Sequence, residues 1–308
     1  MTVGSNNIEV VEVTATMWSS FVEGSPQASL FVSPEFLRDT GSSASFLLAL
    51  RRGLPVAGSI LAAHKQGQQW FQHHSLVLSD EEHLRAQRGS FAHTVAAGEL
   101  FRAAIGASPF GCSFSFHPSI IDVRALNWML DEAGHRYAWQ ARFSGHIDLP
   151  SSRIRGTLAR LLRQGSVLEF ETTATEDSSV LMEVLGQTQI PQVIEDLDWI
   201  EETAKRLITR KMAKVVVAQS VSDRQTRAAS LVVNWRDTAH VMFGGVCGNS
   251  PKRRYVGPVC DDFLIRHATE DGIRIVDLMG MEGRPRAEYK SGWVSRLVCW
   301  LELDWGTG

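Results

Sequence analysis

Hydrophobic and polar positions along the chain predict two successive groups of strands. In each half, three apolar runs are separated by short segments rich in glycine, proline or polar residues, which is the pattern of an antiparallel meander. The runs lie at 46–50, 56–64 and 69–75 in the first half and at 213–221, 226–235 and 239–246 in the second. We therefore expect a three-stranded meander in each half.

Segments with apolar residues every three or four positions predict the helices around these meanders. In 122–133, for example, Val123, Leu126, Met129 and Leu130 share one side of a helix. Helices are predicted at 17–23, 35–40, 90–105, 122–133, 153–165, 178–185, 197–209 and 259–270. Further strands are predicted at 8–14, 112–118, 167–173, 274–280 and 293–305, with a strand pair at 137–143 and 145–149.

The two halves align as an internal repeat. Residues 56–75 lie over 227–246 without a gap and pair Ser59 with Ser230, although few residues are identical. Two unrelated hairpins would also look alike, but in both halves a helix and another strand follow the meander, so we favour duplication. We expect an α/β protein with a mixed sheet (α+β-like). It should have tandem domains at 1–150 and 151–308, each a mostly antiparallel sheet flanked by helices.

Composition limits the classes of protein that this chain can belong to. A length of 308 residues with 44% hydrophobic and 21% charged residues suits two globular domains. The net charge of −3 excludes a wholly basic surface but allows a local basic groove. The four cysteines lack close pairs, so we expect neither a disulfide scaffold nor a zinc site. No run has the pattern of a secretory signal or a membrane span, which favours a soluble cytoplasmic protein.

Three segments carry a resemblance to a known family. They are the basic helix and strand at 160–170, the helix and strands at 122–149, and the stretch 268–293 with its Asp-x-x-Gly and Lys-x-Gly-aromatic motifs. These resemble segments of the Fem-like amino-acid transferases, in which paired acetyltransferase-type (GNAT) domains transfer amino acids from aminoacyl-tRNA to peptidoglycan precursors. Related chains work in natural-product pathways. Nearly every candidate for chemistry falls in 151–308, so we expect this domain to bind the donor and catalyse, and 1–150 to be a degenerate copy on the acceptor side.

Amide formation by direct attack needs few protein groups. The donor carbonyl must lie beside the amine, its oxyanion must be stabilised and a proton must leave, which suits a chain without a nucleophile motif. Lys290 is the first catalytic candidate, because the resemblance implies that this lysine neutralises a phosphate or the oxyanion; a solvated loop lysine is the alternative. Asp277 ends an apolar strand, so we expect a raised pKa and a role as base, or else a hydrogen-bonded turn residue. Glu282 and Glu288 are weaker candidates.

Basic and aromatic residues near these candidates are expected to bind substrate. The stretch 251–258 precedes a predicted helix, where backbone amides and basic side chains attract phosphate. It resembles the coenzyme A loop of GNAT enzymes but ends in proline and valine, which favours another phosphate-bearing partner such as a tRNA end. A solvated basic turn is the alternative. The predicted substrate- or phosphate-binding residues are Lys252, Arg253, Arg254, Tyr255, Gly257, Tyr289 and Trp293, of which Trp293 also suits the core.

Two basic clusters in the second half are candidates for contact with tRNA, although a charged helix face is often only solvated. One cluster contains Arg153, Arg155, Arg160 and Arg163. The other supplies the predicted tRNA-binding residues Lys205, Arg206, Arg210, Lys211 and Lys214. No metal is expected, since His73 and His74 would point to opposite faces of a strand. Gly244 and Gly245 are expected to mark a bulge where a strand separates from its neighbour.

The leading hypothesis is a cytoplasmic N-acyltransferase without a permanently bound cofactor. It would transfer an aminoacyl group from the acceptor end of aminoacyl-tRNA to the amine of a small or nucleotide-linked acceptor, such as a peptidoglycan precursor or a natural-product intermediate. An acyl-CoA-dependent GNAT N-acyltransferase is the alternative. A catalytically silent binding protein on the same fold is a third hypothesis. The amino acid, the acceptor and the oligomeric state do not follow from the sequence.

Overall fold

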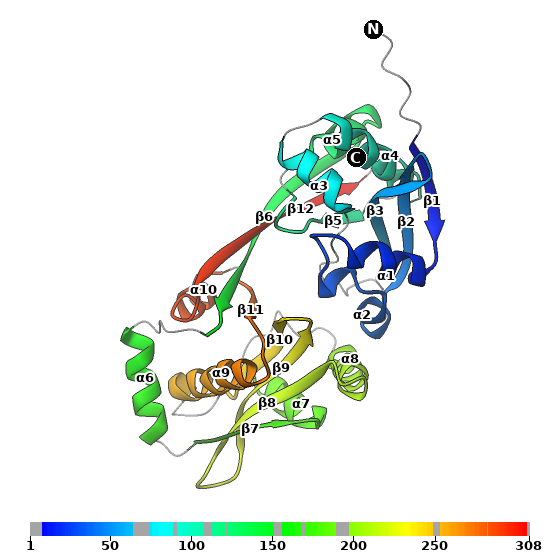
Figure 1. Ribbon diagram of the computed structural model, residues 1–308. Helices are drawn as coiled ribbons and strands as arrows, with labels where there is room; N and C mark the ends of the chain where they lie inside the picture. The colour runs from blue at the N-terminus through cyan, green and yellow to red at the C-terminus, as the bar shows by residue number, and fades with distance from the viewer. Residues whose placement is uncertain are drawn as a thin grey trace. The chain divides into compact units, whose positions relative to one another are not determined.

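The protein consists of two compact units, in each of which helices pack on β-strands (Figure 1). The computed structural model describes residues 8–63, 74, 76–88, 91–107, 112–120, 122–150, 156–167, 170–188, 197–248, 253–281 and 283–306. Unit 1 comprises Met1–Arg142 with Cys299–Gly308, and unit 2 comprises Phe143–Val298. The last ten residues, which the sequence assigned to the second domain, therefore belong to unit 1.

The described strands form two sheets: the strand pairs of the first are antiparallel, and those of the second are mostly antiparallel, with β10 and β11 parallel. The first is in unit 1 and has the order β1 (Ile8–Val13), β2 (Ser43–Arg51), β3 (Leu54–Ala63), β4 (Val77–Leu78). The second has the order β5 (Cys112–Ser115), β12 (Arg296–Gly306), β6 (Arg136–Asp148), β11 (Ile275–Gly280), β10 (Thr238–Val246), β9 (Thr226–Trp235), β8 (Ala213–Ser220), β7 (Phe170–Thr175). The chain passes between the units within β6 and within β12.

Helices cover both faces of the sheet in unit 1. They are α1 (Ala15–Glu23), the 3-10 turn η1 (Leu30–Val32), α2 (Pro34–Asp39), α3 (Asp80–Gln87), α4 (Phe91–Ala107) and α5 (Arg124–Glu132). In β2, Phe46 and Leu48 pack with Trp18 on one face, whereas Leu47 and Ala49 join the core under α4 on the other. A strand buried on both faces gains from apolar side chains at every position, which explains the uninterrupted apolar run of β2.

In unit 2, helices lie on both sides of strands β7–β11 (Figure 1). They are α6 (Gly156–Val167), α7 (Ser178–Gly186), α8 (Leu197–Thr209), α9 (Arg253–Glu270) and α10 (Arg284–Lys290). Helix α9 packs on β8 and β9, and α6 packs on α9. Val216, Val232, Val276 and Leu264 are buried together in the core beneath α9. Helix α7 packs against β9 and β10 on the other side of the sheet.

Several predicted elements differ from the structure. The predicted strand pair at 137–149 is wrong, because β6 is one continuous strand through Gly145. A side chain at Gly145 would lie 2.4 Å from Val294 Cγ2, so this glycine serves close packing rather than a turn. Lys290 ends helix α10 instead of lying in a loop, and α9 begins at Arg253 rather than at 259. Helix α3, capped by Ser79, was not predicted because its residues have few apolar side chains.

The proposed repeat has structural counterparts in the two units. Ser59 lies in β3 and Ser230 in β9, the middle strands of the successions β2–β3–β4 and β8–β9–β10. The predicted strand at 69–75 lies outside the described residues except for His74, which forms an isolated bridge with Ser115. A longer helix, α4 or α9, follows each succession.

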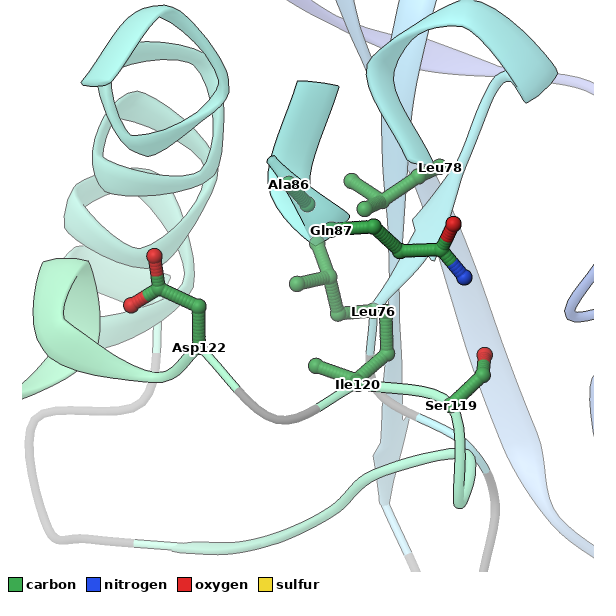
Figure 2. Close-up of a pocket in the computed structure, with 7 residues that line it drawn as sticks. All are labelled: Leu76, Leu78, Ala86, Gln87, Ser119, Ile120 and Asp122. Atoms are coloured by element: carbon green, nitrogen blue, oxygen red, sulfur yellow. The ribbon is translucent and has the colours of Figure 1, made fainter. Parts of the chain in front are cut away.

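A small pocket lies within unit 1 (Figure 2). Its walls are mostly apolar, and the carboxylate of Asp122 at its rim is paired with Arg124 at 2.7 Å. The lining residues are Leu76, Leu78, Ala86, Gln87, Ser119, Ile120 and Asp122. With its one charge already balanced, this pocket offers no evident acid or base for catalysis. Among the described residues, no helix is long and apolar enough to cross a membrane.

Candidate functional site

Strands β10 and β11 separate in the middle of the sheet of unit 2. Their parallel pairing runs from Thr238 opposite Ile275 to His240 opposite Asp277 and stops there. Strand β10 nevertheless continues to Val246 and β11 to Gly280. Both strands also carry an irregularity just beyond this point, as is common beside functional sites. The separation leaves a split whose vertex is the His240–Asp277 pair.

A row of polar residues crosses three strands at this vertex. His240 on β10, Asp277 on β11 and His146 on β6 are direct neighbours in register. Side chains of directly opposite residues point to the same face of a sheet. The residues immediately before or after them, such as Val276 and Ala239, belong to the core under α9. The polar row therefore faces away from α9, on the other side of the sheet.

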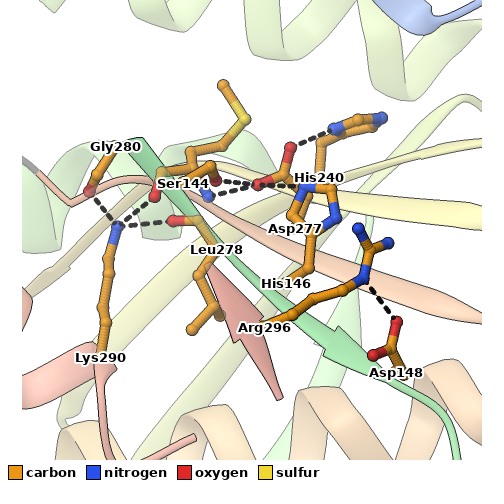
Figure 3. A network of polar contacts seen from close by, with 10 residues as sticks. Ser144, His146, Asp148, His240, Asp277, Leu278, Gly280, Lys290 and Arg296 are labelled. Carbon is orange, nitrogen blue, oxygen red and sulfur yellow. Dashed lines mark hydrogen bonds and ion pairs between the residues drawn. The ribbon is translucent and has the colours of Figure 1, made fainter. Parts of the chain in front are cut away.

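Asp277 is the centre of this row (Figure 3). Its Oδ1 accepts hydrogen bonds from Ser144 Oγ and from the backbone N–H of Met279, the latter at 2.8 Å. Its Oδ2 lies 3.1 Å from His240 Nδ1, and His146 Nε2 lies 3.7 Å from Oδ1. Ser144, His240 and Asp277 are all buried. The carboxylate thus fixes the orientation of the His240 ring, because the hydrogen bond at one ring nitrogen determines the protonation of the other.

The expected raised pKa of Asp277 is wrong. Burial alone would raise it, but the hydrogen bond and charge of His240, aided by His146 and Ser144, outweigh burial and hold the pKa well below its usual range. Asp277 is therefore an anion that accepts hydrogen bonds, not a base poised near neutral pH. Burial lowers the pKa of His146, which favours its neutral form.

Lys290, the last residue of α10, contacts the end of β11 that follows Asp277. Its ammonium donates hydrogen bonds to the carbonyl oxygens of Leu278 at 2.5 Å, Met279 at 3.1 Å and Gly280 at 2.7 Å (Figure 3). Met279 has a positive φ of 56°, and β11 places three residue steps, from Asp277 to Gly280, against two of β6. Lys290 and Asp277 together therefore hold a bulge at the end of β11. A phosphate or oxyanion at Lys290 would compete with these carbonyl groups.

The site also contains Asp261, which the sequence analysis did not single out. It follows the buried Cys260 on α9, and its Oδ2 accepts a 2.5 Å hydrogen bond from the hydroxyl of Tyr289. Burial raises the pKa of Asp261 to about 6, against the opposing effects of the Tyr289 hydrogen bond and the Lys290 charge. Burial and the neighbouring Asp261 raise the pKa of Tyr289 well above 10, although 38% of the whole residue is exposed. The pair becomes apparent only in the structure, because Tyr289 lies on another helix, 28 residues after Asp261.

The sequence of the second half matches the family described as Acetyltransferase (GNAT) domain, over residues 151–291. This range includes α6, the split between β10 and β11, Asp261, Asp277 and Lys290. Residues 151–291 form a GNAT acetyltransferase domain. This match supports a transferase of the acyltransferase class. Comparison with curated protein sequences gives no match.

Solved structures with the same fold span almost the whole chain. FemX has a TM-score of 0.65 at 10% identity, covering 95% of this chain and 96% of its own. A tandem GNAT protein from the clavulanic acid biosynthesis pathway has 0.60 at 10% identity, covering 98% and 99%. The C-terminal domain of a putative lysylphosphatidylglycerol synthetase from Agrobacterium fabrum has 0.54 at 15%, covering 94% and 90%. At these identities the comparison establishes the tandem GNAT fold alone.

From Arg253 onward, the segment compared with the coenzyme A loop is helical in this GNAT domain. Lys252 lies outside the described residues, as does the side chain of Arg253. The exposed Arg254 stacks on the ring of Tyr255, with its guanidinium carbon 4.6 Å from the ring centroid. Gly257 is buried within α9, where an added Cβ would lie 3.4 Å from both the Tyr289 hydroxyl and Val246 Cγ2. Protein side chains thus occupy the space beside this glycine.

The remaining predicted residues fall into different surroundings. Trp293 is buried in the core of unit 2. Gly244 and Gly245 are paired with β9, and the irregularity lies between Val241 and Phe243, so the predicted position of the bulge is wrong. Glu288 pairs with Arg284 at the surface of α10, and Glu282 lies outside the described residues.

The predicted tRNA-binding residues around α8 are largely engaged in ion pairs. Lys205 pairs with Glu201 at 2.5 Å, and Arg206 pairs with Glu202 one helical turn earlier. Lys214 pairs with Asp271 at 2.5 Å. Arg210 and Lys211 are exposed beyond the helix end. The acidic partners reduce the net positive charge that α8 presents.

Proposed function

We propose that unit 2 forms an amide bond by transferring an aminoacyl group from aminoacyl-tRNA to the amine of a small or nucleotide-linked acceptor. The observation that carries the proposal is the split between β10 and β11, with His240 and Asp277 at its vertex, inside the GNAT domain. Beyond the vertex, the backbone of β10 has no pairing to β11 in the described register. Its N–H groups could hold the donor carbonyl and stabilise the oxyanion.

The two faces of the sheet suit two substrates. The donor would approach from the side of α9, and its reactive carbonyl would reach the polar row through the split. The acceptor amine would attack the ester carbonyl carbon, forming the C–N bond. His240, oriented by the anionic Asp277, would take the amine proton and return it to the ribose oxygen as the ester C–O bond breaks. Atoms and charges balance without a covalent enzyme intermediate.

The surroundings of Gly257 favour aminoacyl-tRNA over acyl-CoA as donor. A loop that cradles pyrophosphate uses glycine so that phosphate can approach the backbone. Here Tyr289 and Val246 lie beside Gly257, and the segment is part of a helix that contains Pro258. A peptidoglycan precursor or a natural-product intermediate, each with a free amine, is the class of acceptor that the proposal names.

The test is a transfer assay with two radiolabelled donors and a panel of amines, including nucleotide-linked amino sugars and peptides. One donor is a pool of aminoacyl-tRNA, with and without ribonuclease, and the other is a set of acyl-CoA thioesters. We expect ribonuclease-sensitive product from aminoacyl-tRNA. Product from acyl-CoA that resists ribonuclease would overturn the choice of donor.

Two histidine variants connect the assay to the site. His240→Gln should lower turnover by about 10²–10⁴, the usual contribution of a general base. His267→Gln should leave turnover unchanged, because the His267 side chain pairs with Glu270 and stacks on Phe263 of its own helix, away from the polar row. Equal activity of the two variants would remove His240 from the mechanism.

A further inference from the structure

Besides the α8 cluster, where residues 203–214 contain five lysines and arginines and no aspartate or glutamate, two segments of unit 2 concentrate positive charge. Residues 151–168 contain four arginines, and residues 247–260 contain one lysine and two arginines, with no aspartate or glutamate in either segment. The whole chain has a formal net charge of −3, so these segments differ strongly from the rest. Such a local excess attracts a polyanion even when the protein is acidic overall.

The described parts of these segments flank one turn of the chain. Leu158 of α6 lies against Gly292, and Gly257 of α9 lies against Tyr289. Both helices therefore contact the turn at Tyr289–Gly292, where α10 ends in Lys290. Arg160 is two residues from Leu158, and Arg254 is three residues from Gly257.

The arginines near this turn are exposed. Arg160, Arg163 and Arg254 all lie at the surface, whereas Leu158 is buried on the inner side of α6. Among the residues that the structure describes, Arg160 and Arg254 form no ion pair with a carboxylate, whereas Arg163 takes part in a further interaction within the chain. On α8, by contrast, Lys205 and Arg206 each have a glutamate partner one turn away.

We infer that Arg160 and Arg163 of α6, together with Arg254 of α9, form the surface that binds the phosphates of the tRNA donor, in place of the α8 cluster predicted from sequence. This inference rests on the proposed function and names the surface used by its donor. Guanidinium groups bind phosphate with paired hydrogen bonds. The nearby Tyr289, 38% exposed, could also stack on an unpaired base of the acceptor end.

Nucleic acid fits this surface better than an anionic membrane. A helix that lies on a membrane exposes large apolar side chains beside its basic residues. The large exposed hydrophobic residues of the described chain are Met17, Leu54, Leu84, Trp128, Tyr289 and Leu297, and none of them belongs to α6. Exposed α6 residues near the arginines are instead small or polar, such as Thr157 and Gln164.

The test compares two variants with the same change in charge on two helices of the full-length protein. Arg160→Gln/Arg163→Gln alters α6, and Lys205→Gln/Arg206→Gln alters α8. Binding to fluorescently labelled tRNA is measured between 50 and 300 mM salt, and circular dichroism checks the fold of each variant. Glutamine keeps helix propensity high, so both variants should fold.

The α6 variant should bind tRNA at least tenfold more weakly at low salt. The slope of log K against log salt should fall by about 2, since each lost phosphate contact accounts for about 0.9. The α8 variant should change affinity less than threefold. Arg254→Gln should raise KM for aminoacyl-tRNA and leave kcat close to that of the wild type.

Each contrary result has a distinct meaning. Equal or greater loss in the α8 variant would overturn the inference while leaving the proposed donor intact. Wild-type protein that binds no tRNA would overturn the proposed donor, and this inference with it. Unchanged tRNA binding by the α6 variant, combined with lost binding to phosphatidylglycerol vesicles, would reassign the surface to lipid.

Discussion

Asp261 combines burial with a single strong hydrogen-bond partner, which makes it the residue of the site most sensitive to pH. Its pKa is about 6 in the folded protein, compared with 3.8 for an ordinary aspartate. The folded state therefore keeps its proton at pH values where the unfolded chain has lost it. This group lowers stability as pH rises from about 4 to 6, and the loss persists above pH 6.

Asp261→Asn should remove that dependence. Between pH 4 and pH 7, the variant should become more stable relative to the wild type by about 1–2 kcal/mol in unfolding free energy. One pKa unit corresponds to 1.36 kcal/mol, and the partial exposure of the side chain reduces the effect. Urea unfolding at several pH values measures it. Asp262→Asn is the matched control, because Asp262 pairs with Arg266 at the surface. Parallel pH profiles for Asp261→Asn and the wild type would contradict the prediction.

At the scale of elements, the bulge at the end of β11 brings together two candidate site residues, Asp277 and Lys290. Asp277 accepts the backbone N–H of Met279, and Lys290 donates to three consecutive carbonyl groups of the bulge. The sequence predicted β11 and the importance of both residues, because an apolar strand ends in Asp-x-x-Gly. It could not predict their contacts, since the bulge and the end of α10 depend on the register with β6.

Lys290→Met should loosen this bulge without unfolding unit 2. Three carbonyl groups would lose a charged donor, which costs about 1–3 kcal/mol for a partly buried group. Hydrogen exchange of residues 275–281 should become faster, and turnover should fall. Lys214→Met, which removes only a surface ion pair with Asp271, should do neither. Unchanged exchange in β11 would show that Lys290 is not needed to hold the bulge.

At the scale of the whole molecule, the sequence predicted the tandem fold from periodicity and repeat, but long-range pairing decided the rest. The polar row needs His146, His240 and Asp277 from three strands, and no local spacing places residues so distant in sequence side by side. The last strand is a similar case. Its apolar pattern predicted a strand, but not that its end pairs with β5 in unit 1.

Substitution of two leucines of β12 tests which unit the last residues of the chain stabilise. Leu303 is fully buried in the core of unit 1, whereas Leu297, six residues earlier, is 58% exposed. Leu303→Ala should destabilise unit 1 by about 2–5 kcal/mol through lost burial and a cavity. Leu297→Ala should change stability by less than about 0.5 kcal/mol. Calorimetry with limited proteolysis distinguishes the units, since Leu303→Ala should expose sites before Arg142 and leave α9 protected. Loss of protection in unit 2 instead would mean that the C-terminal residues stabilise the GNAT domain, and the division of the chain would have to be redrawn.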